Sequence, residues 1–522
     1  VAALVVGLVA ARMRINALLI QPFVLLAGAF VVVAAVQNYA DGATVSDRLT
    51  DFSDRMREWW AIVRSGDISN DNLPFVLLVH SATFLAAYFG AWSIYRWHNP
   101  WIALVPGGFV LLSTISFMEG KPGGPLFFFL VGSLFIVARA HLQKSQARWQ
   151  AEGVEYPDWI SLNALNLTFL VSLLLLVVAW QLPIAREAGA AQSLVSAVTK
   201  PFEPLNQHAI RLFHNINGAS GGNFHNFGDS LPIRGEVSLG SKALYEVNSG
   251  EAGYIRGTSY DEYTGVGWKS TERDDQNVDA GQQALETYAE RTTTILRVTV
   301  ADQASTVLTL GTALGTNLDS VTDFDSTNPA DVERVTSRRS LDPGDTYNSV
   351  GSRSTASADQ LRAAGTVYPD WVTSKYLQLP ADLPDRVRVE AARVTNGAET
   401  PYDIAFLTQR YLRSFPYDLS VPAAPPGRDA VDYLLFDLRR GYFDPLSTAM
   451  CVMVRTQGVP CRVAVGYGLD PSDAEETSYT VRKNDAYAWV EVWFPTYGWV
   501  EFNPTSDRPA GGAGPGTGLE GQ

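Results

Sequence analysis

The chain has 522 residues, a formal net charge of −14 at pH 7 and a mean hydropathy near zero. This length exceeds that of a usual single domain, and the acidity argues against a nucleic-acid partner. Two cysteines, Cys451 and Cys461, provide no disulfide framework and no zinc-ligand spacing. The absence of an initiator methionine and a cut-short first apolar run indicate a start inside a longer protein, and no signal peptide is visible.

Apolar segments dominate the first third of the chain. They lie near Val1–Ala10, Ala17–Gln37, Leu73–Trp97, Trp101–Met118, Gly124–His141 and Leu162–Leu182. A helix needs about 20 apolar residues to span a bilayer, and the last five segments approach or reach that length. Buried core helices of a soluble protein are the weaker interpretation, because such long runs with so few charges are rare in soluble domains. The sequence predicts a transmembrane helical domain over residues 1–185, with about six spans of which the first is truncated.

Basic residues between these segments predict the orientation. Arg12, Arg96 and Arg139 each follow an odd-numbered segment, whereas the alternate loops are mixed or acidic. Because basic loops stay cytoplasmic, we expect a multi-pass membrane protein. Residues after about 185 would then lie on the extracytoplasmic side, and membrane lipids would be partners of the chain.

The first outer loop contains an amphipathic pattern. Its apolar members recur at helical spacing and are Val45, Leu49, Phe52, Met56, Trp59, Trp60 and Val63. The pattern predicts a helix that lies on the membrane–water interface. A helix that packs on the transmembrane bundle explains the pattern equally well.

Residues 186–234 are predicted to form a linker. It holds His208, His214 and His225, whose spacing matches no metal-ligand motif. We therefore predict solvated or interfacial histidines, and neither a metal nor a cofactor.

Residues 235–370 are predicted to form a β-rich extracytoplasmic domain. Short β-type runs occur at Ala243–Val247, Tyr254–Tyr260, Thr293–Val300 and Thr306–Leu310. The aromatic segment Tyr254–Trp268 is interpreted as packing in a small β-domain, with a glycan- or peptide-binding face as the alternative. The polar segment Asp323–Asp359 is interpreted as long loops.

Residues 371–507 are predicted to form a separate α+β core. Helical patterns occupy Leu383–Thr395 and Pro401–Arg413, and a Pro-rich extended connection covers Phe415–Gly427. Residues 508–522 are rich in Gly and Pro and are predicted to be a flexible tail.

Several motifs run through the second half of the chain. They are Tyr254–Trp268, Tyr376–Pro380, Pro401–Pro416, Val431–Gly441, Arg439–Arg462, Gly458–Gly466, Asn484–Pro495 and Tyr497–Thr505. The first resembles the β-region, and the others the core, of the bacterial membrane-anchored transglutaminase-like proteins of the TgpA type, which implies a place in the bacterial cytoplasmic (inner) membrane. The resemblance implies a multi-domain membrane protein with an N-terminal α-helical transmembrane bundle, an extracytoplasmic β-rich domain and an α+β transglutaminase-like (papain-like) core. It also implies cysteine protease or transglutaminase chemistry, in which a cysteine at a helix start works with a histidine and an acid on neighbouring strands.

This chain departs from the family pattern at each triad position. The cysteine position holds Phe443, the histidine position holds Tyr487 and the acid position holds Asn503, although the flanking residues match. A benzene ring has no nucleophilic lone pair, and a phenol with a pKa near 10 is a poor base. No histidine follows His225 in the sequence. We therefore predict no catalytic residues and a degenerate triad.

Other residues could in principle replace the nucleophile. Cys451 and Cys461 are interpreted as small core residues, and Ser447 and Thr448 have no visible base. The sequence predicts a catalytically inactive protein that serves as a structural, scaffolding or binding subunit of an envelope or membrane complex, with other membrane or envelope proteins as partners. The alternatives are an active envelope peptidase or acyl transferase with an atypical nucleophile, and a module that binds peptide or glycan without turnover.

Overall fold

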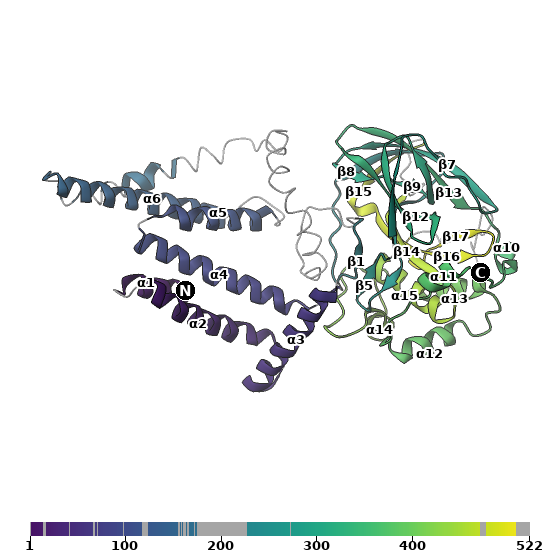
Figure 1. Ribbon diagram of the computed structural model, residues 1–522, viewed down its shortest axis with the longest axis horizontal. Helices are drawn as coiled ribbons and strands as arrows, with labels where there is room; N and C mark the ends of the chain where they lie inside the picture. The colour runs from purple at the N-terminus through teal and green to yellow at the C-terminus, as the bar shows by residue number, and fades with distance from the viewer. Residues whose placement is uncertain are drawn as a thin grey trace. The chain divides into compact units, whose positions relative to one another are not determined.

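The computed structural model describes residues 2–13, 17–40, 42–65, 68–69, 71–97, 99–116, 124–154, 157, 159, 163, 166–171, 173–174, 227–271, 273–469 and 477–507. The chain divides into two compact units. The first comprises mainly residues 1–63 and 71–206, and the second comprises mainly residues 221–522 (Figure 1). Each unit is described by itself.

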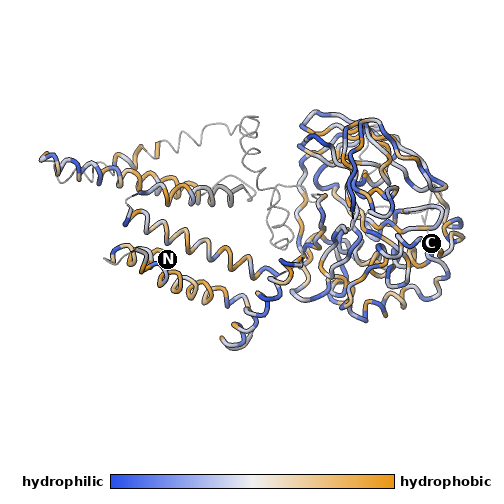
Figure 2. The backbone as a smooth tube through the Cα atoms, viewed as in Figure 1, coloured by the Kyte–Doolittle hydropathy of each residue, from blue (hydrophilic) through white to orange (hydrophobic). Residues whose placement is uncertain are grey.

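The first unit is helical. Its described helices are α1 (Ala2–Arg12), α2 (Ala17–Val36), the short 3-10 helix η1 (Gln37–Tyr39), α3 (Val45–Ser65), α4 (Leu73–Tyr95), α5 (Trp101–Ser116) and α6 (Gly124–Ala151). Figure 2 shows apolar residues dominating α2 and α4. Within the described part of the chain, three stretches are long and apolar enough to cross a membrane: Leu19–Tyr39, Leu73–Tyr95 and Leu126–Ala151.

The predicted spans correspond to helices wherever the structure describes them. The first five apolar segments form α1, α2, α4, α5 and α6. The sixth, Leu162–Leu182, falls largely outside the described residues. The total of about six spans therefore stays a prediction.

Helix α4 packs against α1, α2 and α5. Its contact with α1 is close, because a Cβ atom on Gly7 would lie 2.8 Å from the Cβ of Ala91. The Tyr88 hydroxyl of α4 donates to Gln21 Oε1 of α2 at 2.8 Å. Small residues and a polar bond are the usual means by which apolar helices associate in lipid, where burial of apolar surface gives no net drive.

The amphipathic segment of the first outer loop is a helix, as predicted. Helix α3 covers Val45–Ser65 and buries none of its residues fully. The Arg55 guanidinium forms a two-point ion pair with the Asp71 carboxylate, with Nε 2.9 Å from Oδ2. Whether α3 lies on a membrane surface stays a prediction.

The second unit combines antiparallel sheets with short helices. Its strands are β1 (Ser230–Pro232), β2 (Ala243–Asn248), β3 (Gly253–Tyr260), β4 (Glu262–Tyr263), β5 (Gly267–Lys269), β6 (Arg273–Val278), β7 (Arg291–Val300), β8 (Ala304–Thr306), β9 (Thr309–Leu310), β10 (Thr312–Thr316), β11 (Ser320–Asp325), β12 (Asn328–Leu341), β13 (Thr346–Ser354), β14 (Cys461–Leu469), β15 (Ser478–Arg482), β16 (Ala486–Phe494) and β17 (Gly498–Phe502). Its helices are α10 (Ala358–Ala363), α11 (Asp370–Tyr376), α12 (Asp385–Val394), α13 (Pro401–Leu412), α14 (Ala430–Tyr433), η3 (Leu434–Leu438), α15 (Phe443–Thr456) and η5 (Lys483–Asp485).

The described strands form sheets in the orders β1-β5-β4, β10-β13-β7-β2-β15, β6-β11-β12-β8 and β17-β16-β14-β3-β9. The predicted strands near 243, 254 and 293 are confirmed as β2, β3 and β7, and the run at 306–310 is split between β8 and β9. The predicted helices are confirmed as α12 and α13.

The prediction of long loops over Asp323–Asp359 is wrong. Strands β12 and β13 fill most of this segment. The prediction took the polar composition of this segment as a sign of solvent exposure. Asp331 and Glu333 of β12 are instead buried, and an arginine and a lysine side chain pair with them. Buried carboxylates with charged partners are compatible with a central strand.

Two of the sheets join sequence regions that were predicted to be separate domains. Strand β3 pairs with β14, with Tyr260 opposite Val463. Strand β15 pairs with β2, with Val481 opposite Tyr245. One hydrophobic cluster runs through both regions. The β-rich segment therefore completes the core sheet, and the two regions form one packed body.

The aromatic segment Tyr254–Trp268 is used for packing, as predicted. Tyr260, Tyr263 and Trp268 are buried. The indole Nε1 of Trp268 donates to the Thr448 hydroxyl of α15 at 3.0 Å. The segment therefore anchors the central helix of the core.

Candidate functional site

Helix α15 is the centre of the candidate site. All of its residues from Phe443 to Arg455 are buried, as expected for a helix that is apolar on most sides. It packs on β14 and β16 and is covered by α12, α13 and α14 (Figure 1). Tyr442 is extended and precedes the first helical residue, Phe443. A helix start of this kind offers free N–H groups and a partial positive charge.

The three predicted triad positions come together. The Phe443 and Tyr487 rings have centroids 5.1 Å apart, and the Asn503 amide nitrogen donates to the Tyr487 hydroxyl at 3.2 Å. Tyr487 belongs to β16, and Asn503 follows β17 directly. Their exposed fractions are 1%, 1% and 0% for Phe443, Tyr487 and Asn503. The position expected for a reactive dyad is occupied by two packed rings.

The Tyr487 phenol is a hydrogen-bond donor in this site. Its hydroxyl donates to the Asp507 carboxylate at 2.7 Å. Burial raises the pKa of Tyr487 well above its usual range, and the charges of Tyr254 and Asp507 raise it further. A phenol with so high a pKa stays protonated at neutral pH and cannot accept a proton as a general base.

The Asn503 amide ties several elements together. Its side-chain nitrogen donates to the Tyr254 hydroxyl of β3 at 2.8 Å, and its side-chain oxygen accepts from the Thr505 N–H at 2.9 Å. Its backbone N–H donates to Gln409 Oε1 of α13 at 2.8 Å. These contacts hold the chain end after β17 against the core sheet and α13.

Tyr254 is a site residue that sequence reasoning did not place here. Its ring stacks on Tyr487 with centroids 5.5 Å apart and on Trp489 with centroids 5.1 Å apart. The aromatic segment was noticed, but its place depends on the pairing of β3 with β14. That pairing is close: a Cβ on Gly466 would lie 1.9 Å from the Ile255 carbonyl oxygen, so glycine is required there.

Cys451 and Cys461 form a disulfide, and the expectation of two separate packing cysteines is wrong. Their Cα atoms lie 5.8 Å apart, within the range that a disulfide requires. The chain turns after α15 and enters β14, which brings the two residues together although ten positions separate them. Both are fully buried. Neither sulfur is a thiol in this state.

The hydroxyl groups near the start of α15 have structural partners. Ser447 Oγ donates to the Ala488 carbonyl of β16 at 3.0 Å. Thr448 Oγ1 donates to the Asp444 carbonyl at 2.8 Å. Both residues are fully buried. These bonds attach α15 to the sheet and stabilise its first turns.

A buried charge cluster lies on the same sheet and was not predicted. Arg462 of β14 donates from Nε to Glu491 at 2.6 Å and from Nη1 to Asp331 at 2.8 Å. Its guanidinium also lies 4.1 Å from the Trp499 ring centroid. These residues come from β12, β14, β16 and β17, so only tertiary pairing reveals the cluster. It joins the β-rich segment to the core sheet.

Among the described residues, no group of three or more His, Cys, Asp and Glu side chains is placed to hold a metal ion. His208, His214 and His225 lie outside those residues.

Comparison with known proteins agrees with the core fold. The Transglutaminase-like superfamily (Transglut_core) matches residues 390–504. The chain is 37% identical over 140 residues to "Uncharacterized protein YebA" of Bacillus subtilis. This alignment covers 26% of this chain and 19% of that protein. It is also 37% identical over 131 residues to "Protein-glutamine gamma-glutamyltransferase" of Pseudomonas aeruginosa. That alignment covers 25% of this chain and 19% of that protein. The matched part thus spans about a fifth of the length of these relatives.

Solved structures also align with part of this chain. The periplasmic domain of TgpA from Pseudomonas aeruginosa bound to ethylmercury aligns with 51% of this chain and 90% of that domain, with 22% sequence identity and a TM-score of 0.39. The superfamily match and the two sequence relatives support one assignment: residues 390–504 form a transglutaminase-like domain. The chain that contains it begins with candidate membrane helices, and about a quarter of its length is similar in sequence to YebA and to the Pseudomonas protein-glutamine gamma-glutamyltransferase.

Proposed function

We propose that this protein is a catalytically inactive, membrane-anchored transglutaminase-like protein that serves as a structural, scaffolding or binding subunit in an envelope or membrane protein complex. The observation that carries the proposal is the buried contact of Phe443, Tyr487 and Asn503 at the start of α15. Retention of the surrounding fold without its reactive groups is consistent with a role carried by the surface of the domain.

The chemistry of the site supports inactivity. Acyl transfer by this fold needs a thiolate, a base to form it and an acid to orient the base. Phe443 offers carbon in place of sulfur, and Tyr487 offers a protonated phenol in place of imidazole. Asn503 can accept a hydrogen bond but brings no negative charge.

The alternative is an active envelope peptidase or acyl transferase with an atypical nucleophile. Cys451 and Cys461 are bonded to each other, which removes both thiols. Ser447 and Thr448 are buried and donate to backbone carbonyls of the core. These contacts favour inactivity over this alternative.

A binding module that retains peptide or glycan affinity at the same place is also disfavoured. Phe443, Tyr487 and Tyr254 fill the region where a substrate acyl group would have to reach the helix start. A partner would therefore contact another surface of the domain.

We place the chain in the bacterial inner membrane as a multi-pass protein, with the second unit on the extracytoplasmic side. The basic residues Arg12, Arg96 and Arg139 support this orientation by the positive-inside rule. The disulfide supports it independently, because disulfides persist in oxidising compartments and are rare in the cytoplasm.

The test is a transamidation and amide-hydrolysis assay on the purified full chain in mild detergent. The Pseudomonas protein-glutamine gamma-glutamyltransferase serves as the positive control. We expect no turnover above the background without enzyme. Turnover that is abolished by a substitution at Phe443, Tyr487, Cys451 or Ser447 would overturn the proposal. If no turnover is found, the proteins that co-purify with the chain from native membranes would identify the complex.

A further inference from the structure

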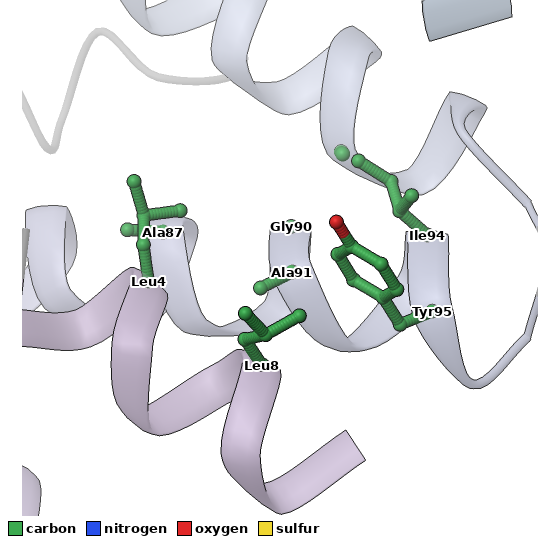
Figure 3. Close-up of a pocket in the computed structure, with 8 residues that line it drawn as sticks. Leu4, Leu8, Ala87, Gly90, Ala91, Ile94 and Tyr95 are labelled. Carbon is green, nitrogen blue, oxygen red and sulfur yellow. The ribbon is translucent and has the colours of Figure 1, made fainter. Parts of the chain in front are cut away.

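An apolar cavity of about 400 Å³ lies between α1, α4 and α5 in the first unit. Its lining residues are Leu4, Leu8, Ala87, Gly90, Ala91, Ile94, Tyr95 and Ala103. Figure 3 shows Leu4 and Leu8 of α1 bordering the same space as Ile94 and Tyr95 of α4. The volume falls within the range of small-molecule sites.

One arginine is placed at the end of this cavity. Leu4, Leu8 and Arg12 follow one another at four-residue spacing, so they lie on one face of α1. The Arg12 side chain is exposed, and its guanidinium carbon lies 5.8 Å from the ring centroid of Tyr95, which itself lines the cavity. The apolar space therefore ends at a cation.

The end of α4 adds positive charge at the same place. Arg96 follows Tyr95 and donates from Nη1 to the Met13 carbonyl oxygen at 3.1 Å, which joins the ends of α4 and α1. Trp97 and Trp101, which follow within five residues in the sequence, are exposed. Aromatic and basic residues together at helix ends are typical of the membrane interface.

We propose that this cavity binds an anionic phospholipid, with one acyl chain between α1, α4 and α5 and the phosphate beside Arg12. The proposal rests on the membrane placement given under the proposed function. Charge complementarity decides the occupant: a negative headgroup pairs with the arginine at the same end at which its acyl chain enters an apolar site. Basic pockets between membrane helices are known to bind anionic headgroups.

The experiment is native mass spectrometry of the full chain, after delipidation in detergent and addition of dioleoyl phosphatidylglycerol or dioleoyl phosphatidylcholine. The two lipids share acyl chains and differ in headgroup charge. We expect the wild-type protein to retain phosphatidylglycerol at least about fivefold better, which corresponds to one basic residue near a membrane surface. R12Q should lower the preference for phosphatidylglycerol, with Arg96 still present at the same end, and should leave the retention of phosphatidylcholine unchanged.

Two further variants separate cavity from charge. A Cβ on Gly90 would meet only the Ala103 Cβ, at 3.6 Å, so G90L should fill the cavity and lower retention of both lipids. R148Q removes an exposed arginine at the end of α6 and should leave the preference unchanged.

Three outcomes would overturn the lipid site: equal retention of both lipids by the wild-type protein, equal losses in R12Q and R148Q, or unchanged retention in G90L. The last would mean that the retained lipid binds outside this cavity. Alkaline carbonate extraction of cell membranes tests the placement separately. A chain released by carbonate contradicts the membrane placement, whereas a retained chain without lipid preference contradicts only the lipid site.

Discussion

Glu491 of β16 and Glu501 of β17 lie directly opposite each other in an antiparallel pair. Glu491 is paired with Arg462 and Arg256. Although burial alone would raise the pKa of Glu491, these two arginines hold it below its usual value. Burial raises the pKa of Glu501 to about 7; Arg353 opposes this rise, and the charge of Glu491 adds to it. One strand pair therefore holds one carboxylate that stays ionised and one carboxyl group whose pKa lies near neutrality.

This arrangement predicts a pH-dependent stability. Because the pKa of Glu501 is higher in the folded state than its ordinary value of 4.5, the folded state binds more protons between about pH 4.5 and pH 7. The contribution of Glu501 to the free energy of unfolding therefore falls as pH rises through this window. E501Q should remove this pH dependence. Above pH 7 its free energy of unfolding should exceed that of the wild-type protein by at most about 3 kcal/mol. Pulse proteolysis in urea on the full chain, from pH 4.5 to 8, measures the difference.

The control for this prediction is E246Q, which changes an exposed glutamate of β2. It should leave the pH profile of the wild-type protein unchanged. If E501Q and E246Q have the same profile, Glu501 is not the titrating group.

The buried Arg462 predicts a large and specific loss of stability. Its removal in R462M would leave Asp331 and Glu491 as buried carboxylates without this partner. We expect a loss of about 3–5 kcal/mol in the free energy of unfolding, the usual cost of breaking a buried ion pair from one side. R338M is the matched control, because Arg338 forms ion pairs at the surface with Asp279 and Asp319. It should change stability by no more than about 1 kcal/mol. Equal effects of the two variants in urea unfolding would show that the cluster adds nothing to stability.

Local patterns in the sequence predicted the elements but not their partners. Apolar runs and helix signals located α1, α2, α4, α12 and α13, because periodicity and end residues act within one element. The triad positions could be located because motif spacing is also local. Tyr254 could not be placed, since its contact with Tyr487 depends on the pairing of β3 with β14, which lies some 200 residues further along the chain.

Two of the errors have the same physical origin. The segment that forms β12 looked like a loop because it is rich in acidic residues. Those residues are compensated by Arg462 and Lys375, which lie far away in the sequence and so could not be recognised as their partners. The Cys451–Cys461 bond was missed because its formation depends on how α15 turns into β14. Composition describes a residue's own preferences, whereas tertiary pairing decides whether a buried charge or thiol is satisfied.

The disulfide itself is testable. We expect no free thiol in the unfolded, unreduced protein, as measured with a thiol-reactive maleimide and mass spectrometry. The pair C451A/C461A should lose about 2–3 kcal/mol in the free energy of unfolding, since a short loop is no longer closed in the unfolded state. Reduction should not destabilise this double variant further. Two reactive thiols in the native protein would contradict the bond and would revive the atypical-nucleophile alternative.

The last prediction concerns the ring contact at the start of α15 and tests whether Phe443 and Tyr487 are part of the packed core. F443A would remove a buried ring that contacts both Tyr442 and Tyr487. We expect a loss of about 3–5 kcal/mol in the free energy of unfolding, from lost burial and the cavity left behind. Y487F keeps the ring and removes only the hydroxyl that Asp507 and Asn503 share, so it should cost about 1–2 kcal/mol.

V389A provides the control for both variants, because Val389 on α12 is 67% exposed. It should leave stability within about 0.5 kcal/mol of the wild-type protein. Urea unfolding of the full chain, followed by pulse proteolysis, ranks the three variants. A neutral F443A would mean that the rings are not packed and that the site retains room for a ligand. The ranking F443A, then Y487F, then V389A would mean that aromatic packing now stabilises the position where the family's catalytic pair is expected.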